Sequence, residues 1–291
     1  MSARIARRLV LPALALTALG QNPAAAEAPH TIARQAALKS GFSTRLTAAF
    51  DPVVSKYFSK MSVQPDAARK KLIADLIQGL ESDQVWSKLD WFVICAAHDE
   101  QAGLLNAVNP DQSLSENGGV TFTTDVGFNG NGTSAYLAYP TTFTATGTMT
   151  LTSATIGAWS SNLVSTRADI GTVGSTNVYL VTSSNSRSIS GRLLGATGIT
   201  PPVSAVASER HLTLSRTGST LKLYEEGSLV ATSTVAPDAA PPSANGALLA
   251  GRAQFSDHTV NVAYSGGSLT DTDVQNLHSR LAVFLSAIHL P

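Results

Sequence analysis

Three oxygen-bearing side chains stand close together in the sequence between residues 125 and 133. Asp125, Asn129 and Asn131 alternate with glycines in the run Asp-Val-Gly-Phe-Asn-Gly-Asn-Gly-Thr. Carboxylate and amide oxygens at short spacing are ligands that calcium takes in proteins, although this spacing differs from that of an EF-hand loop. The alternative is that Asn and Gly supply the positive-φ conformations of tight turns. The loop is therefore a candidate ligand site, and calcium is the only cofactor that it suggests; no metal ligand is assigned.

Two aromatic side chains complete the candidate ligand site. Trp159 and Tyr224 lie in predicted strands, and an exposed aromatic face in such a strand can stack on a sugar ring. Packing in a hydrophobic core explains both residues equally well. The sequence leaves these two roles open, because it does not say which face of a sheet is covered.

No complete catalytic motif occurs in the sequence. Glu225 and Glu226 are the acidic pair that could cleave a glycoside, but the two carboxyls of a glycosidase face each other across a cleft. Adjacent residues of a strand point to opposite faces, and Glu226-Gly227 is better explained as a hairpin turn. Asp99 and Glu100 match the first turn of a helix, where acidic side chains complement the helix dipole. The sequence therefore predicts a protein without catalytic residues and without enzymatic activity.

Charge and cysteine content exclude some classes of protein. The chain has 20 basic and 20 acidic residues, and 43% of its residues are hydrophobic. A balanced charge argues against nucleic-acid binding, which needs a basic face. The single cysteine, Cys95, can form no internal disulfide, and it ends the apolar run Trp91 to Cys95 that predicts a buried strand.

The N-terminal segment has two interpretations. Arg4, Arg7 and Arg8 precede the apolar stretch Leu9–Leu19, and Ala24-Ala25-Ala26 offers a small-residue cleavage site. This arrangement is typical of a secretory signal, and the apolar stretch is too short for an ordinary membrane-spanning helix. The alternative is an uncleaved, flexible N-terminal arm. We therefore expect residues 1–44 to be a leader or an arm with a linker, and we expect no membrane span.

The rest of the chain changes character near residue 107. Residues 45–110 are rich in charge, and Asp51-Pro52 and Pro65-Asp66 are typical helix starts. Beyond residue 118 the sequence is dominated by Ser, Thr and Gly, and its apolar residues alternate with a period of two. The clearest hairpin spans Thr220 to Thr232. Thr270 and Asp273 form a capping box at the start of a C-terminal helix.

Two stretches resemble known families. The hairpin Leu223 to Val230 resembles the Leu-Tyr-x-x-Gly-x-Leu-Val hairpin of laminin-G-like and concanavalin A-like jelly rolls. Residues 85–90, 96–101 and 127–137 are similar to a set of phage and prophage tail or virion proteins. Those proteins place a short helical segment before a lectin-like β-sandwich and finish with a helix. The resemblance covers about residues 48–288.

The residues and the resemblance together define the expected protein. The fold is mainly β: a concanavalin A-like or laminin-G-like β-sandwich (jelly roll) over residues 111–291, preceded by a small helical module at 45–110 and closed by a C-terminal helix. The resemblance implies a non-enzymatic, tail-associated phage virion protein with a structural or receptor-binding role. Its partners would be other virion proteins, further copies of itself and a host-surface glycan. The alternative is a secreted or periplasmic carbohydrate-binding module, if residues 1–26 are a cleaved signal peptide.

Overall fold

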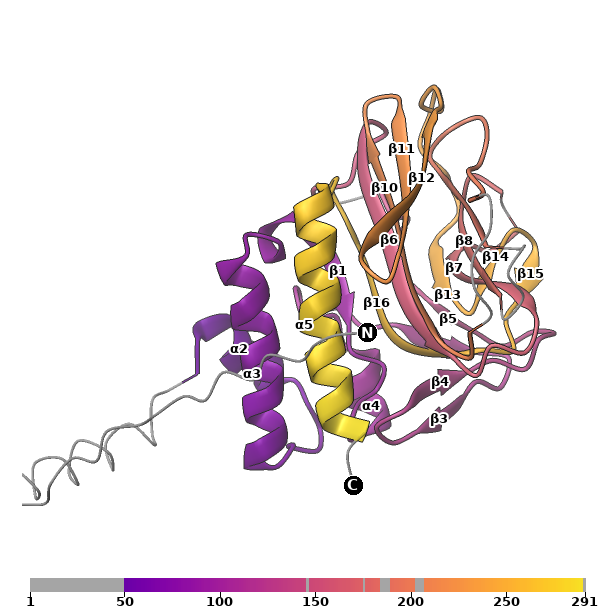
Figure 1. Ribbon diagram of the computed structural model, residues 1–291. Helices are drawn as coiled ribbons and strands as arrows, with labels where there is room; N and C mark the ends of the chain where they lie inside the picture. Colours follow the sequence, from indigo (N-terminus) through magenta and orange to yellow (C-terminus); the bar gives the residue numbers. More distant parts are fainter. Residues whose placement is uncertain (1–49, 145–146, 175, 184–188, 202–206, 290–291) are drawn as a thin grey trace, which may run out of the picture. The chain divides into compact units, whose positions relative to one another are not determined.

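The computed structural model describes residues 50–144, 147–174, 176–183, 189–201 and 207–289. The leader or arm predicted over residues 1–44 lies outside the described residues. Within the described part the helices lie near the two ends of the chain and the strands between them (Figure 1). The helices are α2 (Pro52–Ser59), α3 (Ala67–Ser82), the short 3-10 helix η2 (Trp86–Lys88), α4 (Glu100–Leu104) and α5 (Asp271–His289).

The helix starts follow the predicted caps. The carboxylate of Asp51 accepts the N–H of Val53 at 2.9 Å before α2, and the carboxylate of Asp66 accepts the N–H of Arg69 at 2.7 Å before α3. These bonds satisfy backbone donors that a helix leaves unpaired in its first turn.

The start of α5 is a capping box. The Thr270 hydroxyl accepts the N–H of Asp273 at 3.2 Å, and the Asp273 carboxylate accepts the N–H of Thr270 at 2.8 Å. The two side chains thus satisfy two backbone donors reciprocally, which confirms the predicted helix start.

The larger of the two main sheets has eight strands. Its order is β12-β11-β10-β6-β16-β4-β3, and β1 also pairs with β16. The predicted hairpin forms its β11–β12 edge, with the turn at Glu226 (φ 49°) and Gly227 (φ 75°). The strands are β1 (Leu89–Val93), β3 (Thr121–Thr123), β4 (Gly127–Asn129), β6 (Ser153–Ser161), β10 (Arg210–Thr217), β11 (Thr220–Glu225), β12 (Ser228–Thr234) and β16 (Thr259–Gly266).

The smaller sheet has six strands in the order β2-β5-β13-β7-β8-β9. It packs against one face of the large sheet, and apolar side chains of both sheets, such as Leu212 and Leu180, share one buried cluster. Its strands are β2 (Ser115–Asn117), β5 (Tyr136–Ala138), β7 (Thr166–Thr172), β8 (Val178–Ser183), β9 (Ser190–Leu193) and β13 (Gly246–Leu248), and a separate two-stranded ribbon joins β14 (Ala250–Gly251) to β15 (Gln254–Phe255).

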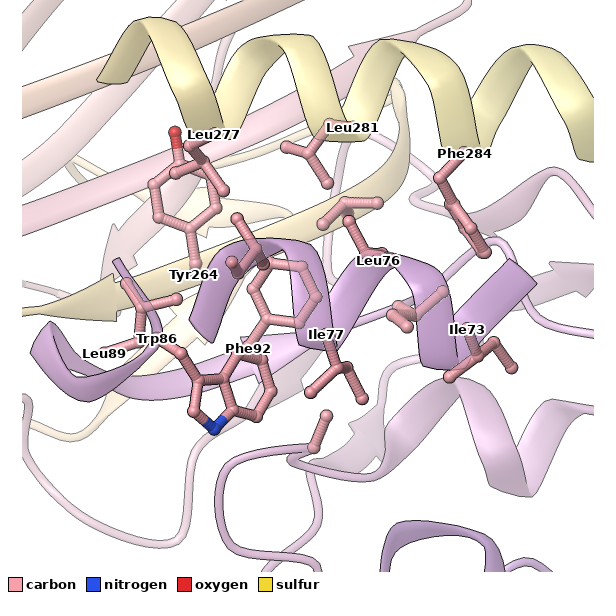
Figure 2. Close-up of a cluster of buried hydrophobic side chains, with 14 of the residues drawn as sticks. Ile73, Leu76, Ile77, Trp86, Leu89, Phe92, Tyr264, Leu277, Leu281 and Phe284 are labelled. Carbon is pink, nitrogen blue, oxygen red and sulfur yellow. The ribbon is translucent and has the colours of Figure 1, made fainter. Parts of the chain in front are cut away.

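The other face of the large sheet is covered by helices. Phe92 and Tyr264 leave the sheet on this face and pack among apolar side chains of α3 and α5. Figure 2 shows α5 above these rings, with Leu277, Leu281 and Phe284 pointing down from it, and α3 beside them. The cluster also contains Ile73, Leu76, Ile77, Trp86 and Leu89. The helical segment and the β-sandwich therefore share a hydrophobic core.

The fold class predicted from the sequence is confirmed. The protein is mainly β, with two antiparallel sheets packed face to face as a sandwich, preceding helices and a C-terminal helix. In each sheet, apolar residues at alternate positions of the strands face the other sheet. Burying these two apolar faces against each other holds the sandwich together. Among the described residues, no helix is long and apolar enough to cross a membrane.

Candidate functional site

The oxygen ligands predicted around residues 125–131 are engaged in separate parts of the structure. Asp125 stands at a positive φ of 63° in the β3–β4 turn, where its carboxylate forms an ion pair with Arg69 of α3. The Asn129 side chain donates to the Thr259 hydroxyl at 2.9 Å. No group of three or more His, Cys, Asp or Glu side chains that could hold a metal ion occurs in the described residues.

Asn131 organises its own loop. Its side-chain oxygen accepts the N–H groups of Thr133, Ser134 and Ala135 at 2.9–3.0 Å, and its nitrogen donates to the carbonyl of Gly118 at 2.9 Å. These bonds are those of an Asx-type turn, in which the side chain replaces a backbone partner. The structure thus gives Asn131 the turn-forming role.

Trp159 and Tyr224 lie on the outer face of the large sheet, beneath α5. Trp159 is 8% exposed and Tyr224 is 1% exposed. The Tyr224 hydroxyl donates to Asp271 at 2.7 Å, at the start of the covering helix. Because α5 covers the part of the sheet that carries them, both rings are packed in the interior. Their faces are not accessible to a ligand.

An open groove of about 590 Å³ lies where this face emerges from under α5. One wall is the first turn of α5, and the floor is the outer face of β10 and β11. The groove is lined by Ser215, Thr217, Thr220, Lys222, Leu269, Thr270, Asp271 and Thr272. Hydroxyl groups dominate this lining, and no aromatic ring is among these eight residues.

The sheet register explains why hydroxyls gather in the groove. Thr217 pairs with Thr220 and Ser215 with Lys222 between β10 and β11, and Thr220 pairs with Thr234 of β12. Directly paired residues of antiparallel strands point to the same face. Polar residues of neighbouring strands are therefore aligned on the outer face, while alternate residues such as Leu221 point into the sandwich core.

The groove carries one ion pair. Lys222 Nζ lies 2.6 Å from a carboxylate oxygen of Asp271, which also accepts the Tyr224 hydroxyl. The hydrogen bonds from Lys222 and then Tyr224 lower the pKa of Asp271, so this carboxyl is ionised at neutral pH. The groove thus offers an anionic acceptor beside a cationic donor, with hydroxyls around them.

A second polar cluster is sealed inside the sandwich. His258 is 0% exposed and Asp169 is 1% exposed, and His258 Nδ1 lies 2.9 Å from Asp169 Oδ1. His258 Nε2 lies 3.0 Å from the carbonyl of Ser165, while Ser256 and Thr182 donate their hydroxyls to Asp169. Both partners of the imidazole are acceptors, so each ring nitrogen carries a proton.

The charge on this imidazole has a clear electrostatic cause. Burial opposes the charge, but the Asp169 carboxylate and the two hydrogen bonds outweigh burial and raise the pKa of His258. Removing one member of such a buried, fully hydrogen-bonded ion pair is strongly destabilising, so we assign this pair a role in stability. Sequence reasoning missed this pair, because its members are separated by 89 positions.

The comparisons with known proteins bear on the fold. No protein-family model matches the chain, and no curated protein matches it. Among solved structures, a mutant of Trypanosoma rangeli sialidase displaying trans-sialidase activity is similar at a TM-score of 0.51 and 12% identity, over 75% of this chain and 40% of the sialidase. This chain therefore spans less than half of that protein.

Two further structures are similar at lower scores. The binding domain of botulinum neurotoxin serotype D has a TM-score of 0.49 at 7% identity, over 67% of this chain and 52% of that domain. Domain 4 of an extracellular arabinanase from Geobacillus stearothermophilus, in complex with arabinotriose, has a TM-score of 0.43 at 14% identity, over 66% of this chain and 98% of that domain. At these identities a likeness concerns the fold alone.

One sequence-based prediction needs correction here. The sequence predicted a protein without enzymatic activity, and the comparison contradicts this, because the similar structure at a TM-score of 0.51 is an enzyme, the mutant sialidase. The absence of a recognisable motif in one chain was too weak a basis for that prediction. At 12% identity and partial coverage the sialidases assign no activity to this chain either.

Proposed function

We propose that this protein binds a carbohydrate in the groove between the first turn of α5 and the outer face of β10 and β11. The observation that carries the proposal is the lining: hydroxyl side chains surround one carboxylate and one ammonium group in an open hollow of about 590 Å³. Neutral sugars present many hydroxyls and little charge. A site lined by hydroxyl groups, each of which can donate and accept a hydrogen bond, matches the hydroxyls of a sugar.

Asp271 is the central residue of the proposed site. Its side chain is 57% exposed, and it retains acceptor positions beyond those used by Lys222 and Tyr224. A carboxylate provides about four lone-pair positions, so it can accept from two neighbouring sugar hydroxyls. The hydroxyls of Thr217 and Thr220 would supply further donors and acceptors.

We expect Asp271→Asn to weaken carbohydrate binding by roughly ten- to hundredfold, because a hydrogen bond to a charged acceptor contributes about 1.5–3 kcal/mol. The measurement is a screen of neutral oligosaccharides on an array, followed by titration calorimetry of the best ligand. Asp75→Asn is the matched control, because Asp75 also forms an exposed ion pair with a lysine, Lys71, away from the groove. Equal affinities of the two variants, or no binding by the wild-type protein, would reject the proposed site.

For the setting of this activity we propose a phage particle. The support is the resemblance of residues 85–90, 96–101 and 127–137 to phage tail and virion proteins. A binding module present in several copies on a particle would gain avidity for a host-surface glycan. Mass spectrometry of purified particles from the source strain should then recover peptides of this chain. Recovery only from the secreted or periplasmic fraction, beginning at Glu27, would favour the alternative of a secreted carbohydrate-binding module.

A further inference from the structure

Three aromatic rings are stacked between the large sheet and α5. Trp159 of β6 and His211 of β10 are register partners, and His278 comes from α5. The ring centroids lie 5.2–5.3 Å apart, and the interplanar angles are between 1° and 14°. One histidine of the sheet, His211, thus contacts one histidine of the helix, His278.

The two histidines share one hydrogen bond. His211 Nδ1 lies 3.0 Å from His278 Nδ1, and His211 Nε2 lies 2.7 Å from the hydroxyl of Tyr264. A contact between two imidazole nitrogens needs one N–H and one lone pair. When both rings are fully protonated, two N–H groups face each other and the contact is lost.

The environment holds this pair in its neutral form. His211 is 0% exposed, and burial, followed by the neighbouring His278, lowers the pKa of His211 to about 3. The side chain of His278 is 20% exposed, and burial lowers its pKa as well. The folded state therefore binds these protons more weakly than an undocked helix does.

The groups around the pair do not cancel this effect. Glu226 of the β11–β12 turn lies 3.7 Å from His278 Nδ1 and accepts the backbone N–H of His211 at 2.9 Å. Burial raises the pKa of Glu226, so its attraction for a proton on His278 fades in acid. The charge of Glu209 raises the pKa of Glu226 further. Among the cations of the same sheet and of the helical layer, Arg210 pairs with Glu225, Lys222 with Asp271, Lys88 with Asp273 and Arg280 with Asp83.

Close packing makes the contact sensitive to small movements. A Cβ at Gly227 would meet the His278 Cβ at 2.9 Å and its ring at 3.1 Å, and a Cβ at Gly157 would meet the Tyr264 ring at 2.2 Å. The two glycines thus allow the β11–β12 turn and β6 to approach His278 and Tyr264 closely. With His211 buried between sheet and helix, we expect loss of the histidine contact to be relieved by movement of the helix.

We propose that the His211–His278 pair is a proton-operated latch, which holds α5 against the large sheet when neutral and releases the helix when protonated. Because Asp271 and Thr272 of α5, with Thr270 just before it, form a wall of the groove, release of the helix would also widen the proposed carbohydrate site. That second consequence rests on the proposed function, whereas the latch itself does not.

Amide hydrogen exchange tests the latch in the wild-type chain without any ligand. Exchange rates of α5, corrected for the intrinsic effect of pH, are compared between pH 7.5 and pH 5.0 with those of β16. With an unfolded pKa of 6.5 and a folded pKa of about 3, His211 alone makes helix opening about thirtyfold more favourable at pH 5. Faster exchange in α5 than in β16 is the expected result. Equal changes in both elements, or none, would overturn the proposal.

The double variant His211→Gln/His278→Gln removes both titrations and keeps two hydrogen-bonding side chains. Its exchange in α5 should change by less than about twofold over the same range, while the control His289→Gln, on the exposed end of the same helix, should behave like wild type. A pH response of about thirtyfold that persists in the double variant would overturn the proposal, and if this variant does not fold, the wild-type comparison remains decisive. Oligosaccharide affinity measured at both pH values then tests the groove separately.

Discussion

Asp169→Ala is expected to destabilise the protein by about 3–5 kcal/mol, because removing one member of a buried ion pair leaves the other uncompensated. Asp169 is the acceptor for His258 Nδ1 and for the hydroxyls of Ser256 and Thr182, all of them inside the sandwich. Without the carboxylate, three buried donors lose their partner. Urea unfolding followed by fluorescence measures the loss.

Asp257→Ala is the control for this prediction. Asp257 also approaches His258, at 3.8 Å, but its side chain is 32% exposed. Water screens that interaction and can replace it, so we expect a loss of less than about 1 kcal/mol. If the two variants lose the same free energy of unfolding, burial of the Asp169–His258 pair is not the reason for its contribution to stability.

The Asp169–His258 pair also makes the stability of the protein depend on pH. The pKa of His258 is raised in the folded state, so the pair stabilises the protein fully below the unfolded value of 6.5 and loses this contribution as the pH rises through the folded value. The difference in stability between wild type and Asp169→Ala should therefore shrink at alkaline pH. The His211–His278 pair has the opposite sign, since lowered pKa values give stability above 6.5 that is lost on acidification.

Phe92→Ala is expected to cost about 3–5 kcal/mol as well, the usual range for truncating a buried aromatic ring. Phe92 is 0% exposed and packs edge-on against Trp86, with ring centroids 5.6 Å apart. It lies in the cluster that joins the large sheet to α3 and α5 (Figure 2). Far-ultraviolet circular dichroism and tryptophan fluorescence should report one common, shifted unfolding transition.

Val283→Ala is the control on the opposite side of the helical layer. Val283 is 72% exposed on α5, and surface truncations of this kind change stability by about 0.5 kcal/mol or less. If Phe92→Ala unfolds the helices first and leaves the sheets intact, the helical segment and the sandwich do not form one cooperative unit.

Local signals in the sequence were sufficient for the elements. The caps at Asp51, Asp66 and Thr270 appear where short-range chemistry places them, and Glu226-Gly227 forms the predicted turn. Each of these features depends on residues within about four positions of one another. Period-two alternation likewise predicted the β-strands, because one face of every strand has to be buried, while the sandwich was expected from the resemblance to jelly-roll proteins.

The sequence by itself thus determined the element types, the helix starts and the mainly β fold, although the strand expected over Trp91 to Cys95 lies at Leu89–Val93. Tertiary structure decided which face of the large sheet α5 covers, and this buried Trp159 and Tyr224 and left hydroxyls of β10 and β11 open as a groove. It also brought together His211 and His278, 67 positions apart. Alternation along a strand separates two faces, but the side chains that meet across layers depend on strand order and helix docking, which local patterns do not encode.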